Sequence, residues 1–413
     1  MSKDNSKFFK EKKIWSIVKD ELLACYLKPY LSKVMSMKKP ILYIDGFSGK
    51  GKFDDGTAGS PLIAVECIRQ CIDLFEKAND GAPAPEVLSC FIEAVYADDL
   101  QCNLLRQPFH GFRVRRGTFS DEIIAALNTA GKQYDDINVF LYVDPYGVKV
   151  LNDELFTMLP DFFRTAELLI NFNSFGFIRE GCRVMKVAFR ESESEVLSDL
   201  EEADPSNAKS ISELNNAIGG DYWQQVIIGY RENRYDCYEA EKKLSELYKA
   251  HLRQKYAYVL DMPIRLKPGH HPKYRMVHAT NHPDGCILMA DNMSKRTDRL
   301  VIDVQNRGQL SLFEVNADNV VVSDEELENK MTALLQSKAE STRLNLILAE
   351  FFNTYGVLCG TSRLSSGKTG SILKTMEKQG KIKVERYRSD DVLDSNARFW
   401  TESKGQKIML QWR

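Results

Sequence analysis

The sequence predicts an α/β protein built on a doubly wound parallel sheet, and three observations favour this class. Short apolar runs alternate with stretches that show helical spacing of apolar residues. The runs are apolar on both faces, as strands covered by helices on both sides are. The first run leads into the glycine-rich stretch "DGFSGKGKFDDGTAGS" (45–60). Loops at the carboxyl ends of such strands bind ligands.

The elements follow in order along the chain. A helix over 7–37 precedes a strand at 41–47. The next helix runs from Ser60 to Lys77, with Ser60 expected at the N-cap and Pro61 at the first helical position. Four further units of strand and helix follow, and their strands lie within 87–94, 112–119, 137–147 and 166–177.

The alternation ends after the fifth strand. Residues from about 180 to 270 read as a polar helical insertion, and a strand at 273–282 returns the chain to the sheet. Two helices and a hairpin then predict a winged-helix-like C-terminal domain; they lie at 343–353, 369–378, 381–387 and 397–402. The predicted divisions are a helical segment 1–40, an α/β domain 41–293, a connector 294–325 and the C-terminal domain 326–413.

Composition indicates a folded, water-soluble chain that we expect in the cytoplasm. Of 413 residues, 43% are hydrophobic, and no apolar run approaches the roughly 20 residues that a membrane span needs. The N-terminus is charged where a signal peptide would be apolar. Nine scattered cysteines form no C-x-x-C pair, which argues against a disulfide framework and a zinc–cysteine site.

Both ends of the chain are basic although the formal net charge is −2. Residues 341–413 hold 13 lysines and arginines against 7 acids, and residues 1–40 hold 10 against 4. Such ends suit contact with nucleic-acid phosphates through the C-terminal domain. Lysine-rich terminal helices also serve solubility, so this alternative stays open.

Three ligand classes compete for the glycine-rich loop. A phosphate-binding P-loop is excluded, because "SSGKTG" (365–370) has Ser362 at the first glycine position and no preceding strand. A dinucleotide is disfavoured, because Asp54 replaces the third glycine of G-x-G-x-x-G and would face a pyrophosphate. A ligand that carries an ammonium or a sulfonium tolerates that carboxylate. S-adenosylmethionine carries both.

The motifs point to a family. "YIDGFSGKG" resembles the first motif of class I methyltransferases, and "FIEA" and "YVDPYG" resemble their second and fourth. More closely, "YIDGFSGKG…DGTAGSPL", "DPYG", "LLINF", an insertion with Trp223 and "ATNHPDG" occur in the order of the three-Cys-motif partner family (TcmP). The resemblance covers roughly residues 10 to 290. It implies a Rossmann-like methyltransferase fold and a three-cysteine partner protein that is radical-S-adenosylmethionine-like.

The resemblance also implies roles for single residues. Around the methionine part of the cofactor it places Asp45, Phe47, Gly49 and Gly51, with Glu93 at the ribose and Asp144 and Tyr146 at the catalytic mouth. Amino-group methyltransferases carry D-P-P followed by an aromatic residue there, whereas this chain has D-P-Y-G. Purely structural explanations of these residues stay open as alternatives. The glycines would allow close packing of helix and strand, and Asp144 would cap a turn.

The histidines and one short peptide bear on metal and partner binding, and two classes of function stay open. A metal site is not expected, because no cysteine or acid completes a ligand set with His270, His271, His278 and His282. The pentapeptide Gln309–Phe313, "QLSLF", resembles the peptide that binds the sliding clamp. One function class is a methyltransferase acting on a nucleic-acid base. The other is a non-catalytic nucleic-acid-binding or regulatory partner of the three-cysteine protein.

Overall fold

The structure is a computed structural model. It describes residues 12, 14–134, 136–145, 147–148, 151–163, 165–190, 193, 210–265, 272, 274–300, 322–368, 370–388, 391–402 and 405–413. The chain divides into two compact units. The first comprises Met1–Ala257 and Pro263–Asn281, and the second comprises Tyr258–Met262 and His282–Arg413.

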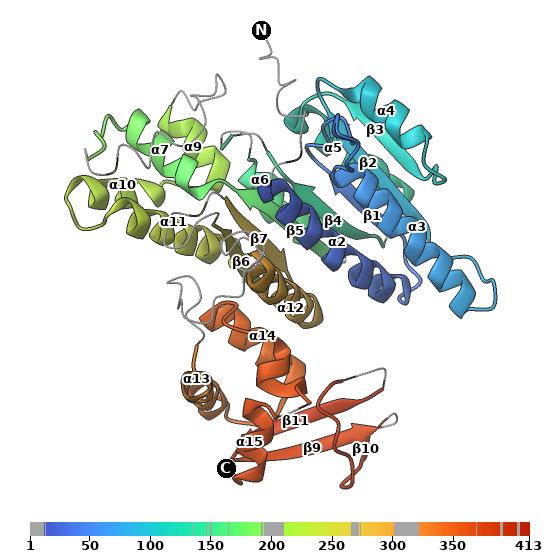
Figure 1. The fold of residues 1–413 in the computed structure, drawn as a ribbon, viewed down its shortest axis with the longest axis vertical. Helices are drawn as coiled ribbons and strands as arrows, with labels where there is room; N and C mark the ends of the chain where they lie inside the picture. The colour runs from blue at the N-terminus through green and yellow to red at the C-terminus, as the bar shows by residue number, and fades with distance from the viewer. Residues whose placement is uncertain are drawn as a thin grey trace. The chain divides into compact units, whose positions relative to one another are not determined.

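A seven-stranded sheet has the order β3-β2-β1-β4-β5-β7-β6, and all of its strands except most of β6 belong to the first unit (Figure 1). Strands β1 to β5 pair in parallel, and β7 runs antiparallel to β5. The order changes direction between β1 and β4, and ligands of doubly wound folds bind outside the carboxyl ends of the strands at such a point. This parallel-dominated sheet fits a Rossmann-like methyltransferase fold, which confirms the predicted α/β class. The strands are β1 Ile41–Asp45, β2 Val87–Glu93, β3 Phe112–Arg116, β4 Asn138–Val143, β5 Thr165–Phe172, β6 Tyr258–Ile264 and β7 Tyr274–Thr280.

Helices cover both faces of the sheet. On one face, α2 and α3 lie side by side in front of the strands (Figure 1). Tyr26 of α2 packs against Phe140 of β4, and Phe140 stacks on Tyr43 of β1 at 6.0 Å between ring centroids. Every residue of β1 and β4 is buried, because both faces are covered. The helices flanking these strands are α2 Ile14–Met35, α3 Ser60–Ala78, α4 Ala97–Leu105, α5 Phe119–Gln133 and α6 Asp153–Phe162.

The predicted insertion is helical over much of its described part. It includes α7 Ser174–Val184, α9 Ile211–Ile218, α10 Trp223–Arg231 and α11 Cys237–Leu252. Trp223 is fully buried and donates from its indole nitrogen to Asn215 Oδ1 at 2.8 Å. Glu241 of α11 forms a buried ion pair with Arg275 of β7, with Oε1 2.5 Å from Nε. The insertion is therefore anchored to the sheet by charge as well as by packing.

Strand β6 differs from the prediction, which placed its residues in the helical insertion. Its buried positions alternate, and it lies at the edge of the sheet next to β7. Pro263 within β6 argued against a strand, but an edge strand tolerates a proline because one side of its backbone needs no ladder partner.

The second unit combines helices with a four-stranded sheet in the order β10-β9-β11-β8. The predicted hairpin partner at 397–402 was wrong: β9 pairs antiparallel with β11 instead. In β11 the side chains of Ile408 and Leu410 alternate into the core, whereas 397–402 forms no strand. The elements are α12 Pro283–Arg299, α13 Asp324–Gln336, β8 Thr342–Arg343, α14 Leu344–Tyr355, the π-helical turn Ser362–Ser366, α15 Ile372–Lys378, β9 Ile382–Arg388, β10 Val392–Leu393 and β11 Lys407–Trp412.

The basic residues of β9 are all paired with carboxylates. Lys383 contacts Glu385 at 2.7 Å, and the other two pairs are Arg386–Glu377 at 2.9 Å and Arg388–Asp394 at 2.5 Å. These pairs neutralise much of the positive charge that composition assigned to this segment. The expectation that this unit contacts nucleic acid stays a prediction.

Candidate functional site

The glycine-rich loop follows β1 and closes on itself before α3. Gly49 and Gly51 have φ of 59° and 74°, in the left-handed region that glycine adopts most readily. A Cβ on Gly51 would lie 2.9 Å from Leu100 Cδ1, so this glycine is also required for packing against α4. Gly59 N donates to Gly51 O at 2.9 Å and closes the loop. Packing and a possible ligand thus require the same glycine at position 51.

Glu93, the last residue of β2, fixes the loop from the side. Its Oε2 accepts from Gly49 N at 2.7 Å, and its Oε1 accepts from Val95 N and Tyr96 N at 2.8 and 3.0 Å. A carboxylate has about four acceptor positions. Donors from the described residues use three of these positions, and one on Oε2 has no donor among them. The half-buried carboxylate therefore both holds the loop and retains an acceptor.

Asp45 ends β1 and is fully buried. Burial raises the pKa of Asp45 to about 7, against the opposing effect of its hydrogen bonds from Ser60 Oγ and Phe47 N. Those bonds measure 2.6 and 3.1 Å. Ser60 was expected to be the N-cap of α3, but Gly59 occupies that position. The Ser60 hydroxyl donates its hydrogen bond to Asp45 instead. The ring of Phe47 stacks on Phe119 at 5.1 Å.

Asp144, just after β4, is held by side chains from α2 and β5. Lys19 Nζ of α2 lies 2.8 and 2.7 Å from its two carboxylate oxygens. Asn171 Nδ2 at the end of β5 donates to Asp144 Oδ1 at 2.6 Å. The Lys19 ammonium also lies over the ring of Tyr274, 5.0 Å from its centroid. An ammonium thus occupies the space beside Asp144, between a carboxylate and an aromatic ring.

A third carboxylate, Asp20, belongs to the same region. Its Oδ2 lies 2.6 Å from Lys12 Nζ, and burial raises its pKa to about 6 although Lys12 opposes the shift. Asp20, Asp45 and Asp144 affect one another electrostatically. We call Lys19, Asp20, Asp45, Asp144 and Asn171 the carboxyl-edge cluster. Two of its three carboxylates have pKa values near neutrality, so its charge changes within the physiological range.

Unused polar atoms lie in and beside the cluster. Asn171 Oδ1 and the Tyr43 hydroxyl are buried and have no hydrogen-bond partner among the described residues. A buried polar atom without a partner costs free energy that a ligand would recover. Together with the free acceptor position of Glu93 and three carboxylates, they fit a ligand that has hydroxyl groups and positive charge. S-adenosylmethionine meets both conditions.

Of the other predicted site residues, the structure describes some and leaves others outside the described ranges. Tyr146 and Gln309–Phe313 lie outside the described residues, as do His270 and His271. His278 is buried in β7, with Nε2 3.2 Å from Glu167 Oε2, and His282 caps α12. No group of three or more histidine, cysteine or acidic residues in the described part of the chain is placed to hold a metal ion.

Lys19, Asp20 and Asn171 were missed by the sequence analysis. The lysine and the aspartate lie in a helix that was read as amphipathic with lysines on its solvent side, yet both are buried. A signal was present in the asparagine of "LLINF", a polar residue that ends a buried strand directly beside the one that precedes Asp144. Among the described residues, no helix has the length and apolar character that crossing a membrane requires.

Comparisons with known proteins add one distant structural match. No family model matches the chain, and no curated protein does. One matching solved structure is loganic acid methyltransferase with SAH, with 8% sequence identity and a TM-score of 0.26. The match covers 68% of this chain and 97% of that one. At this identity and TM-score it carries no argument about function.

Proposed function

We propose that the first unit binds S-adenosylmethionine across the carboxyl ends of β1 and β2. The observation that carries this proposal is the position of Glu93 at the carboxyl end of β2, beside β1, where it holds the Gly49 amide and keeps one acceptor position among the described residues. A ribose hydroxyl would donate to that position. The loop glycines would let the backbone approach the ligand closely.

Charge supports a cationic nucleoside over a dinucleotide. Asp20 and Asp45 are buried in the same region, and neutralising them by protonation is less favourable when a cation is near. A sulfonium or ammonium would lower their pKa values and bind more tightly as they ionise. A pyrophosphate would have the opposite effect. Bound S-adenosylmethionine would supply a methyl group attached to a positively charged sulfur.

Transfer of that methyl group requires an acceptor with a free lone pair next to Asp144. The Asp144 carboxylate would hold an acceptor amine and accept its hydrogen bond. Lys19 fills this place with an ammonium, so an acceptor must displace it. The proposed acceptor is an exocyclic amine of a nucleic-acid base, delivered by a winged-helix-like C-terminal unit. The proposed catalytic role includes Tyr146, which lies outside the described residues.

A second candidate function is a partner that binds the cofactor without turnover. The Lys19–Asp144 pair favours it, because the ion pair occupies the acceptor position in the described conformation. The resemblance to the three-Cys-motif partner family agrees with this role, in which the three-cysteine protein performs the chemistry. The proposed clamp contact through Gln309–Phe313 would be compatible with either function.

Calorimetry with S-adenosylmethionine tests the binding proposal. Glu93→Ala should weaken binding by roughly 1–3 kcal/mol, because the ribose donors lose their acceptor. Asp98→Ala is the matched control, since it removes an equal charge from exposed α4. Hydrogen exchange of the loop checks that Glu93→Ala still folds. No binding by wild type at millimolar ligand, or equal loss in both variants, would refute the proposal.

Tritium transfer separates the two candidate functions. The methyl-labelled cofactor is incubated with DNA, RNA and protein, with and without the three-cysteine partner. Incorporation that Asp144→Ala abolishes supports the enzyme. Cofactor binding without incorporation in any mixture supports the non-catalytic partner.

A further inference from the structure

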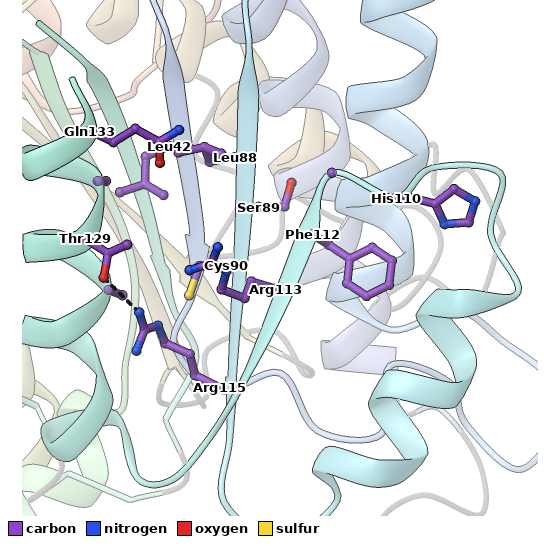
Figure 2. Close-up of a pocket in the computed structure, with 13 residues that line it drawn as sticks. Leu42, Leu88, Ser89, Cys90, His110, Phe112, Arg113, Arg115, Thr129 and Gln133 are labelled. Carbon is purple, nitrogen blue, oxygen red and sulfur yellow. Dashed lines mark hydrogen bonds between the residues drawn. The ribbon is translucent and has the colours of Figure 1, made fainter.

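A cavity of about 200 Å³ lies between β2, β3 and helix α5, and its lining includes no residue of the carboxyl-edge cluster. Its apolar part consists of Leu42 and Leu88 from the sheet and Ala126 and Ala130 from α5. Two arginines of the edge strand β3 also line it (Figure 2). We call this cavity the arginine pocket. The proposed cofactor role of the chain does not use it.

The two terminal nitrogens of the Arg115 guanidinium have partners, whereas its Nε has none among the described residues. Nη2 donates to Thr129 Oγ1 at 3.1 Å, and Nη1 lies 3.2 Å from Glu122 Oε2. Figure 2 shows Arg115 pointing toward Thr129. Its Nε is buried and has no acceptor within the described ranges, while the Cys90 thiol interacts with the same guanidinium. A buried charged donor without an acceptor is unfavourable, so this atom indicates a missing partner.

Arg113 adds a second positive charge at the same pocket. It is exposed, and its side chain makes no ion pair or hydrogen bond among the residues that the structure describes. Alternation along β3 puts Arg113 and Arg115 on one face of the sheet. The lining includes no carboxylate, and Glu122 forms an ion pair with Arg115. Burial raises the pKa of the Cys90 thiol to about 11, so the thiol adds no negative charge at neutral pH.

Two features narrow the ligand class. The cavity is smaller than the roughly 300 Å³ at which pockets for drug-sized ligands begin, so the ligand is small. Thr129 and Gln133 place the pocket beside the last turn of α5, where the helix dipole is negative. A doubly charged phosphate is disfavoured there relative to a singly charged group. A planar carboxylate also matches the geometry of a guanidinium.

We propose that the arginine pocket binds a small organic carboxylate, with the carboxylate on Arg113 and Arg115 Nε and an apolar body against Leu42, Leu88 and Ala126. A plainer explanation is that arginines on an edge strand only prevent pairing with other strands. That explanation predicts that no ligand binds. It also predicts that Arg116, the third arginine of β3, has the same role as Arg113.

Calorimetric titration of the full chain with benzoate separates the two explanations. Benzoate should bind at millimolar concentration, and Arg113→Gln should weaken binding roughly tenfold or more. Arg116→Gln is the matched control: it removes the same charge from the same strand, but Arg116 pairs with Asp98 and lies outside the lining. It should leave binding unchanged. Both arginines are exposed, so neither change removes a buried contact.

Two related probes test the ligand class. Benzamide has the same shape without the charge and should bind at least tenfold more weakly than benzoate, and phenyl phosphate should also bind more weakly. The proposal is overturned if benzoate does not bind, if both variants lose affinity equally, or if benzamide binds as well as benzoate. Phenyl phosphate as the tightest ligand would replace the carboxylate with a phosphate.

Discussion

Two carboxylates, one in each unit, have pKa values that are shifted in opposite directions. Asp45 in the carboxyl-edge cluster is buried, and its pKa is raised to about 7 mainly by that burial. Glu385 in β9 is partly exposed, and hydrogen bonds from Lys383 and Tyr387 lower its pKa. Burial makes the charged form of Asp45 unfavourable, whereas the ion pair with Lys383 stabilises the charged form of Glu385. Costly buried charges gather at functional sites, so the difference points to the first region.

The largest expected effect concerns Asp45. Its native pKa is raised from 3.8 to about 7, so between these values the native state binds a proton that the unfolded state has lost. The free energy of unfolding therefore falls as pH rises from about 4 to 7, by roughly 4 kcal/mol at about 1.4 kcal/mol per pKa unit. Asp45→Asn should remove most of this loss. Hydrogen exchange of β1 and β4 at several pH values measures it.

An Asp45→Asn chain that loses stability with pH as steeply as wild type would contradict this account. Asp20→Asn serves as the companion variant, because the pKa of Asp20 is also raised, to about 6. Its effect should be smaller and should be complete at lower pH.

Lys19→Met should have the next largest effect. It leaves Asp144 with Asn171 and without its cation, and the loss of a partner for a partly buried charge should cost about 1–3 kcal/mol of stability. The same change should strengthen S-adenosylmethionine binding by roughly 1 kcal/mol, because a positive charge leaves the site. Calorimetry and hydrogen exchange together measure both effects. Weaker cofactor binding would show that Lys19 supports the ligand rather than competing with it.

The smallest effect is expected in the second unit. Glu385→Gln should change stability by less than about 1 kcal/mol, as exposed ion pairs usually do. Because the native pKa of Glu385 is lowered, its contribution is present at neutral pH and disappears as the pH falls below the usual glutamate range. Hydrogen exchange of β9 and β11 reports it. The pH dependence is opposite in sign to that of Asp45, which makes this variant a check on the comparison.

The sequence analysis recovered features encoded in short segments. The apolar runs located β1, β2 and β4, and the polar residues after them placed Asp45, Glu93 and Asp144 at one edge of the sheet. Contacts between distant segments were not accessible in this way. Lys19 reaches Asp144 across 125 positions of the chain, and no local pattern records which face of a lysine-rich helix is buried.

The same reason explains the other differences. Pro263 lies in an edge strand whose neighbour β7 begins ten residues after β6 ends, and the strand that pairs with β9 depends on tertiary contacts. The arginine pocket was not foreseen because "FRVRR" reads as an ordinary strand, and only its pairing and α5 create the cavity.

Proton release during cofactor binding tests the central claim most directly. The protein is titrated with S-adenosylmethionine at a pH just below 7, in two buffers with different ionisation enthalpies, and again at higher pH. If the cofactor's positive charge lies against Asp45, binding releases protons below pH 7, and Asp45→Asn abolishes much of that release. Adenosine, which lacks the cation, should release few. Binding with no proton release at any pH, or release unchanged in Asp45→Asn, would contradict the account.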